Sequence, residues 1–339
     1  MRVLTRRQLN RALLARQLLL ERSRSPLPRV VERVGCLQTQ YAPSAYIGLW
    51  TRVEGFARDD LTRALERRSL IQAMLMRNTI HVVSRRDYWP LAIAIRGERK
   101  AWSRRVQRAD DRELERAAQG LRRFLADGPR KQAEIAASGF WRPGIAVWVD
   151  VVRVPPSGTW ERRRADLYGL AEDWVGPEPD LSEEEARGQL VRRYLGAFGP
   201  APRADIANWA GMRVDALAEA LERVSLRRFR DEHGSELLDV PRAPLAPEDT
   251  AAPARFLPTW DASLLVHARR TAILDEQHRA RIFHVRNPQS ERTFLVDGKV
   301  AGTWRYERGR VRLEAFGRLT RDARRELAEE GERLAAFHA

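Results

Sequence analysis

Residues 195–240 constrain the fold of this chain more than any other segment. Gly199-Pro200 ends a preceding helix, and 205–210 has the composition of a short helix. Gly211 supplies a turn that tolerates the left-handed conformation, and 213–224 predicts a second helix. Two short apolar runs on either side of a polar turn then predict a β-hairpin. This order is typical of a helix-turn-helix followed by a hairpin wing, and a plain helical hairpin is the alternative.

Two weaker copies of the same order lie upstream. Gly128-Pro129 breaks the chain before a short helix, and the β-forming residues 149–154 then lead into a polar loop. In the N-terminal third, 59–68 predicts a helix and 73–83 predicts a strand. The recurrence of helices followed by short β segments predicts an α+β chain dominated by tandem winged helices.

The last 80 residues have a different pattern, that of a β meander. Strands are predicted at 281–286, 293–296, 300–306 and 311–316. Asp297-Gly298 is the strongest hairpin signal in this region. A charged helix that starts at Asp322 closes the chain.

The charge balance favours a polyanionic partner. Lys and Arg number 61 against 46 Asp and Glu, which gives a formal net charge of +15. The near absence of lysine is typical of a GC-rich genome, but codon bias does not explain the excess of cations over anions. Neutralising phosphates releases counterions, so this excess indicates nucleic-acid binding, with a role in solubility alone as the alternative.

Several classes of site are disfavoured. Cys36 is the only cysteine, and the six histidines contain no pair at HExxH spacing, so we expect no disulfide, no metal and a reducing, cytoplasmic location. No GxxxxGK[ST] or GxGxxG motif occurs, so we expect no nucleotide cofactor. No apolar run approaches the roughly 20 residues that span a bilayer, so we expect no membrane partner.

Two segments carry candidate site residues. Between Gly35 and Pro43 the chain is expected to be extended, which would place Gln38 and Gln40 on the same side. Two primary amides can hold a water molecule and a polar ligand, but they cannot transfer protons as ordinary acids or bases. A structural role for both is the alternative.

The second segment contains Arg77, Thr79 and His81, which would share one face of the predicted strand at 73–83. Such a trio suits phosphate binding, and a structural histidine is the alternative. Further downstream, the predicted loop carries an aromatic residue and three cations that suit contact with DNA, namely Trp160, Arg162, Arg163 and Arg164. A solvated basic loop is the alternative there.

Five motifs in order extend over essentially the whole chain. They are Leu37-Gln38-Thr39-Gln40, Arg77-x-Thr79-x-His81, Phe198-Gly199-Pro200, Leu257-Pro258-x-x-Asp261 and Val296-Asp297-Gly298-x-Val300-x-Gly302-x-Trp304. Together they resemble the winged-helix DNA glycosylases of bacterial interstrand-crosslink repair and antibiotic self-resistance, the AlkZ/YcaQ-like family.

The resemblance implies three tandem winged helices that form a concave DNA-binding surface. We expect them at 1–110, 111–180 and 181–255, with a C-terminal β-hairpin region and helix at 256–339. The resemblance places the family's catalytic Gln-x-Gln motif on Gln38 and Gln40. Members of the YcaQ branch have Asp at the second position, so the Gln40 of this chain is similar to the self-resistance branch. We also expect the 286–292 hairpin, with Arg286 and Arg292, to contact a groove of the DNA, like the loop that carries Trp160.

The resemblance also implies a reaction. Family members excise N7-alkylated guanines, including crosslinks, without metal or cofactor. We therefore expect a monofunctional glycosylase, without AP-lyase activity, that acts as a monomer on double-stranded DNA with alkylated bases. A winged-helix transcription regulator, or a non-catalytic protein that shields damaged DNA, is the alternative function.

Overall fold

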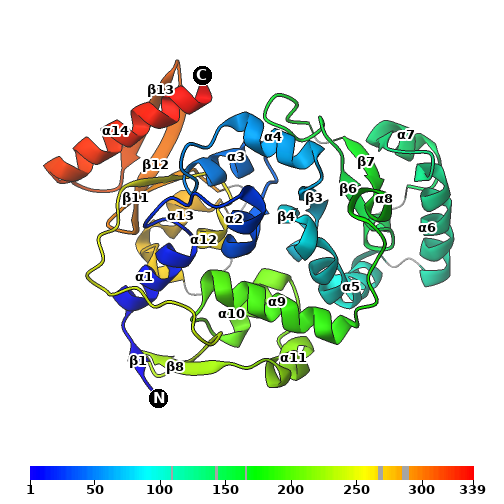
Figure 1. Cartoon of the computed structure of the whole chain (residues 1–339), viewed down its shortest axis with the longest axis horizontal. Helices are drawn as coiled ribbons and strands as arrows, with labels where there is room; N and C mark the ends of the chain where they lie inside the picture. The colour runs from blue at the N-terminus through cyan, green and yellow to red at the C-terminus, as the bar shows by residue number, and fades with distance from the viewer. Residues whose placement is uncertain (108–109, 142–143, 165, 266–269, 285–289) are drawn as a thin grey trace.

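The computed structural model describes residues 1–107, 110–141, 144–164, 166–265, 270–284 and 290–339 (Figure 1). Its longer helices are α1 (Arg6–Arg16), α2 (Leu27–Val34), α3 (Pro43–Trp50), α4 (Arg58–Glu66), α5 (Arg85–Gln107), α6 (Asp111–Leu125), α9 (Glu183–Phe198), α10 (Arg203–Ala210) and α14 (Arg321–His338). Its shorter helices are α7 (Gln132–Ala137), α8 (Ala171–Val175), α11 (Ala218–Arg223), α12 (Ala262–Leu265) and α13 (Arg279–Ile282). Single 3-10 turns are η1 (Met76–Asn78), η2 (Ile145–Val147), η3 (Asp215–Leu217), η4 (Arg270–Ala272) and η5 (Glu276–His278).

The described strands form three sheets. The largest has the order β2 (Leu37–Gln38), β4 (Ile80–Ser84), β3 (Leu70–Met74), β6 (Val151–Arg153), β7 (Leu167–Leu170) and β5 (Arg130–Lys131). A second has the order β10 (Arg255–Leu257), β11 (Thr293–Val296), β12 (Lys299–Glu307) and β13 (Arg310–Ala315). The third contains β1 (Val3–Leu4), β8 (Arg227–Asp231) and β9 (Glu236–Asp239). The expected α+β class is confirmed.

The helix-turn-helix and hairpin predicted at 195–240 are present. Helix α10 ends at Ala210, and its C-cap Gly211 has a φ of 74° in the left-handed region. The second helix begins later than expected, as the 3-10 turn η3, and continues as α11. Strands β8 and β9 form the hairpin, and β8 also pairs in parallel with β1 at the N-terminus, a contact that the sequence did not predict.

The prediction of one strand over 73–83 was wrong. The segment is a hairpin in which β3 and β4 are joined by a turn at Arg77 and Asn78, with φ values of 53° and 54°. Arg77 therefore does not share a strand face with Thr79 and His81. On its other edge β3 pairs with β6, so this sheet continues across the expected boundary at residue 110.

The C-terminal meander is largely as predicted. Strands β11, β12 and β13 match three of the expected strands, and α14 begins one residue before Asp322, behind the N-cap Thr320. The strand predicted at 281–286 is not present as such, because its first residues lie in α13, and 285–286 are outside the described residues.

Two apolar cores meet at the segment that carries the glutamines. One core packs α5 along α9, and Figure 1 shows these helices side by side. The other lies among α2, α3, α4 and α14. Cys36 belongs to the first core and Leu37 to the second, so the chain at β2 is held from both sides. Burial of a large apolar side chain such as Leu37 stabilises the fold by about 2 kcal/mol.

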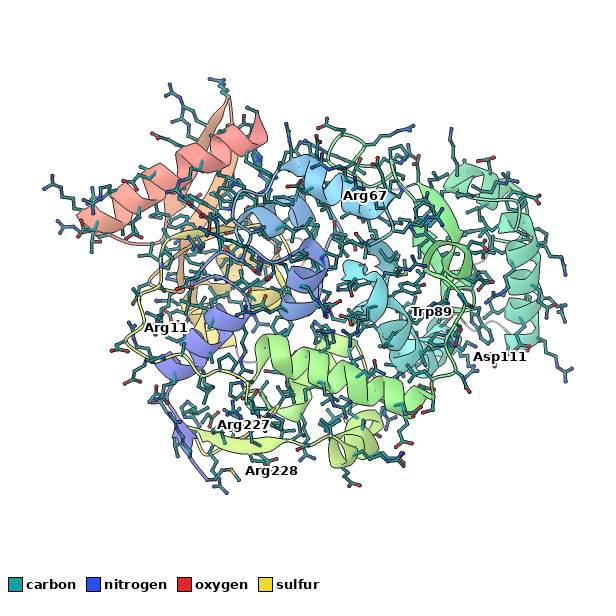
Figure 2. The ribbon with its side chains drawn as sticks, viewed as in Figure 1. Arg11, Arg67, Trp89, Asp111, Arg227 and Arg228 are labelled. Atoms are coloured by element: carbon teal, nitrogen blue, oxygen red, sulfur yellow. The ribbon has the colours of Figure 1, made fainter. Side chains whose placement is uncertain are left out.

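Some of the arginines are structural. Arg16 of α1 pairs with Asp239 of β9 at 2.7 Å, and both side chains are buried. Arg52 pairs with Asp261 at 2.9 Å, also buried, which explains the Asp in the Leu-Pro-x-x-Asp motif. Arg11, labelled in Figure 2, reaches from α1 to the Asp297 turn. Arg16 therefore links α1 to β9, whereas Arg11 and Arg52 link the N-terminal part of the chain to the C-terminal region.

Candidate active site

Gln38 lies at the end of β2, opposite His81 of β4 in the antiparallel ladder. Its side chain is nearly buried, with 8% of its surface exposed. The amide oxygen Oε1 accepts a hydrogen bond from Nη2 of Arg77 at 2.7 Å. Because this bond involves a charged donor, it is stronger than a neutral one and fixes the rotation of the amide.

Arg77 is held in place by the helix-turn-helix. Its Nη1 donates to the carbonyl oxygen of Trp209, near the end of α10. A Cβ on Gly211 would lie 2.9 Å from the backbone nitrogen and Cα of Arg77, so only glycine permits this close approach. Both Nη atoms thus bond within the protein, and burial lowers the pKa of the guanidinium. This geometry favours a positioning role over the phosphate contact expected from the sequence.

Gln40 is exposed, two residues beyond Gln38. Its Oε1 accepts from the backbone N–H of Ile80 at 3.1 Å, and the N–H of Thr39 donates to the carbonyl of Ile80 at 2.8 Å. The segment is therefore tied to the start of β4 by both main-chain and side-chain bonds. In the part of the chain that the structure describes, neither glutamine Nε2 donates to a protein group, so both remain available to a ligand or water.

His81 is fully buried, which corrects the expectation that it contacts phosphate. Its Nδ1 lies 3.0 Å from the carbonyl oxygen of Thr79, which can only accept, so Nδ1 carries the proton. Burial and the nearby charge of Arg77 lower the pKa of His81 to about 3, so the ring is neutral at pH 7. Thr79 is half-buried, and its hydroxyl donates to the carbonyl of Met76.

The two glutamines and the β3–β4 hairpin lie within the part of the chain that matches a known protein family. The family model described as "DNA glycosylase AlkZ-like" matches residues 31–337. The chain belongs to the AlkZ-like DNA glycosylase family. DNA is accordingly the substrate of this AlkZ-like protein, and the resemblance drawn from the motifs is confirmed.

A solved structure supports the fold of this AlkZ-like chain. The Streptomyces sahachiroi DNA glycosylase AlkZ superposes with a TM-score of 0.85 and covers 98% of this chain and 97% of its own. The sequence identity is only 18%, so the likeness concerns the fold. No curated protein matches the sequence. No helix within the described ranges is both long and apolar enough to cross a membrane.

Trp160 does not have the exposed position expected of a residue that contacts DNA. It is 7% exposed, and its ring packs against Tyr46 at 5.7 Å and Phe337 at 5.5 Å between centroids. The ring is consequently unavailable to stack on a base. No local sequence signal predicts this, because Phe337 is far away in the chain.

The candidate arginines differ in their surroundings. Arg162, Arg163 and Arg164 are exposed on the loop between β6 and β7. Arg163 donates from Nη1 to the hydroxyl of Tyr41 at 3.0 Å, which brings this loop beside Gln40. Arg292 is half-buried, with its guanidinium over Trp304, and Arg286 lies outside the described residues. Sequence reasoning missed Tyr41, although it directly follows Gln40.

The chemistry open to this site is limited by its side chains. Burial raises the pKa of the neighbouring Cys36 thiol to about 12, so it is no nucleophile at neutral pH. Among the described residues, no group of three or more His, Cys, Asp or Glu side chains could hold a metal ion. The amides of Gln38 and Gln40 can orient water and stabilise positive charge through their oxygens, but they cannot act as strong general bases.

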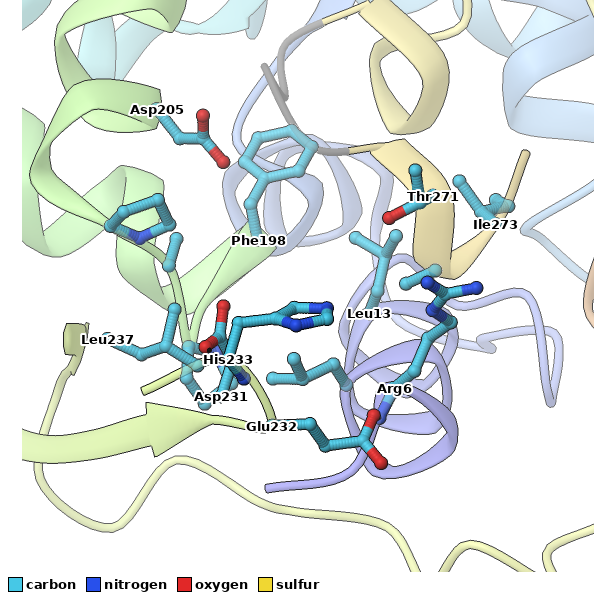
Figure 3. Close-up of a pocket in the computed structure, with 15 residues that line it drawn as sticks. Arg6, Leu13, Phe198, Asp205, Asp231, Glu232, His233, Leu237, Thr271 and Ile273 are labelled. Atoms are coloured by element: carbon cyan, nitrogen blue, oxygen red, sulfur yellow. Dashed lines mark hydrogen bonds between the residues drawn. The ribbon is translucent and has the colours of Figure 1, made fainter. Parts of the chain in front are cut away.

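A separate pocket lies between α1, α10 and the hairpin of β8 and β9 (Figure 3). Its volume is about 100 Å³, and its walls include Leu13, Phe198, Asp205 and Leu237. Gln38 and Gln40 do not line it. It is therefore separate from the candidate active site.

Proposed function

We propose that this DNA glycosylase excises N7-alkylated purines, including bulky adducts and interstrand crosslinks, by attack of water on the deoxyribose. The observation that carries this proposal is the fixed amide of Gln38 beside the exposed Gln40. N7 alkylation makes guanine cationic and a good leaving group, so its departure needs no protonation. A site of neutral amides fits such labile lesions, since it offers no strong acid or base.

The glutamine oxygens supply the electrostatic part of this mechanism. As the base leaves, positive charge develops on the deoxyribose. Each Oε1 accepts one protein hydrogen bond and retains a second lone pair, which can face this charge or accept from the attacking water. Groups held before the reaction stabilise the transition state without reorganisation. No lysine is invoked, so no Schiff base forms and the abasic strand stays intact.

The exposure of Gln40 supports action on bulky lesions. A base that carries a large adduct or a crosslink does not fit a deep, closed pocket, whereas an exposed amide can meet it at the surface. We further propose that 1–110, 111–180 and 181–255 form three winged helices around a concave surface for double-stranded DNA, flanked by 256–339. In this proposal a monomer acts on DNA in the bacterial cytoplasm. Its role is to repair the DNA alkylation caused by an antibiotic that the producing bacterium makes, which is antibiotic self-resistance.

The direct test is release of base from a duplex that contains one 7-methylguanine. We expect free 7-methylguanine and a strand that breaks only after heat or alkali. Gln38→Ala and Gln40→Ala should each slow release about 10²-fold, the scale of losing one preorganised polar group, while duplex binding stays unchanged. Full activity in the double alanine variant would remove the pair from the mechanism. A sequence-specific footprint without base release would favour a transcription regulator instead.

A further inference from the structure

Three arginines from distant segments lie near His338, in the last turn of α14. Arg58 begins α4, Arg163 lies in the loop between β6 and β7, and Arg292 precedes β11. The guanidinium carbon of Arg58 lies 5.2 Å from the centroid of the Trp160 ring, and that of Arg163 lies 5.7 Å from it. The guanidinium of Arg292 lies 5.3 Å from the Trp304 ring. Aromatic stacking occupies the face of each guanidinium and leaves its edge to donate. Arg163 uses Nε for the carbonyl of Trp160 and Nη1 for Tyr41, so its Nη2 is the group that faces a ligand.

His338 joins the two aromatic platforms. Its ring centroid lies 5.3 Å from that of Trp160, 6.0 Å from that of Trp304 and 4.4 Å from that of Tyr306. Its Nδ1 is buried and has no hydrogen-bond partner among the described residues. Burial and the charges of Arg292, Arg58 and Arg163 lower the pKa of His338 to about 4, so it is neutral at pH 7.

The three arginines are not neutralised within the described part of the chain. None of them forms an ion pair with a carboxylate there, whereas Arg11 and Arg16 do. Arg58 and Arg292 are half-buried and Arg163 is exposed, so an anion can reach the cluster from solvent. Three like charges around one neutral ring repel one another, and an anion bound between them would relieve this repulsion.

The position of the cluster identifies the anion. Arg163 donates to the hydroxyl of Tyr41, the residue that follows Gln40. We infer that Arg58, Arg163 and Arg292 together bind one phosphodiester of the DNA backbone beside the damaged nucleotide. This inference rests on the proposed function for the location of the lesion, but the binding itself concerns any duplex. Guanidinium groups form charge-assisted hydrogen bonds to phosphate oxygens that would fix the register of the strand at the glutamines.

The first test measures binding of an unmodified duplex at several salt concentrations. We compare Arg58→Gln, Arg163→Gln, Arg292→Gln and the triple variant. Arg325→Gln, which removes the same charge from an exposed ion pair on α14, is the control. Neutralising one phosphate contributes about 0.9 to the slope of log K against log salt. In the triple variant the slope should be smaller in magnitude by about 0.9, the contribution of one phosphate, and affinity at 100 mM salt should fall about tenfold or more. The control should keep the wild-type slope.

Two slopes would overturn the inference. An unchanged slope means that the cluster does not contact phosphate, and a loss near three times 0.9 means that each arginine contacts a different one. Arg163→Gln is the variant that should fold normally, because Arg163 is the exposed member of the three. Its slope therefore reports on phosphate contact even if the triple variant misfolds. The proposed function is judged separately by base release: excision with an unchanged slope would reject only this site, and a changed slope without excision would reject only the function.

The second test follows His338 by NMR titration. A phosphodiester between the arginines offsets their charge, so the pKa of His338 should rise from about 4 toward its ordinary value of 6.5 when duplex binds. Arg325→Gln should leave this rise intact. The same rise with millimolar inorganic phosphate, and no further change with duplex, would indicate a general anion site and contradict the backbone assignment.

Discussion

At Gln38, one guanidinium determines how the amide is presented. Arg77 bonds at once to Oε1 of Gln38 and to the carbonyl of Trp209. Lysine carries the same charge, but its single ammonium lacks the planar fork that reaches both acceptors. Arg77→Lys should therefore lower the single-turnover rate of base release by about 10- to 100-fold, the effect of a small misplacement.

Duplex affinity is the control for Arg77→Lys. We expect it within about twofold of wild type, because both Nη atoms of Arg77 already bond within the protein. An unchanged rate together with weaker binding would show that Arg77 acts as a phosphate ligand, as the sequence alone indicated.

Loss of Asp239 should strongly destabilise the fold. This residue is fully buried and accepts from Nη1 and Nη2 of Arg16 at 2.7 and 3.0 Å. Asp239→Ala would leave the charge of Arg16 buried without its partner, which costs about 3–5 kcal/mol of unfolding free energy. Denaturant unfolding measures this loss. Asp215→Ala breaks an exposed pair with Arg213 and should cause little change, so equal effects of the two would refute the argument.

The sequence could not separate arginines that face DNA from arginines that link elements. Arg16 and Arg163 have the same local character in a chain with 61 basic residues. Arg16 is buried with its partner Asp239, and the sequence does not reveal this pair because the two residues are 223 positions apart. Trp160 and His81 were misjudged for the same reason, since their burial depends on elements distant in the chain. The local chemistry of Gln38 and Gln40 made them candidates but left a structural role open, and the family motif then marked them as catalytic.

At the scale of elements, the turn of the helix-turn-helix supports the candidate active site. Gly211 has a φ of 74° and touches the backbone of Arg77. Gly211→Ala should cost about 1–2 kcal/mol for the left-handed conformation, more for the contact, and should also slow excision by displacing Arg77. Gly309 has a φ of 75°, and a Cβ at this position would meet no atom within 4 Å, so Gly309→Ala should lose only the conformational part.

The two glycine variants are compared by thermal unfolding and by base release at saturating enzyme. If Gly309→Ala slows excision as much as Gly211→Ala does, the contact with Arg77 has no functional role.

Elements were predicted well where turn chemistry was explicit. Gly211 and Asp297-Gly298 marked real turns, and α10, β11 and β12 follow from them. The turn between β3 and β4 was missed because Arg77 and Asn78 adopt positive φ without a glycine. At 281–286 the meander pattern predicted a strand, but Arg281 lies in a short helix, where it stacks on Phe316 and pairs with Glu314.

At the scale of the whole molecule, the net charge of +15 predicts a strong dependence of DNA binding on salt. Contact with six phosphates would give a slope of about −5 and an affinity loss of about 10³-fold between 50 and 200 mM salt. Fluorescence anisotropy with an unmodified duplex measures this slope. A slope near zero would show that the excess charge does not face DNA.

In the proposed mechanism the two glutamines promote departure of an already labile base. The most direct measurement is single-turnover release of 7-methylguanine from a duplex at saturating enzyme, for the wild type and for the Gln38→Ala/Gln40→Ala double variant. We expect a rate at least about 10²-fold lower in the double variant, with the same dissociation constant for the duplex. Equal rates for the two proteins would contradict this mechanism.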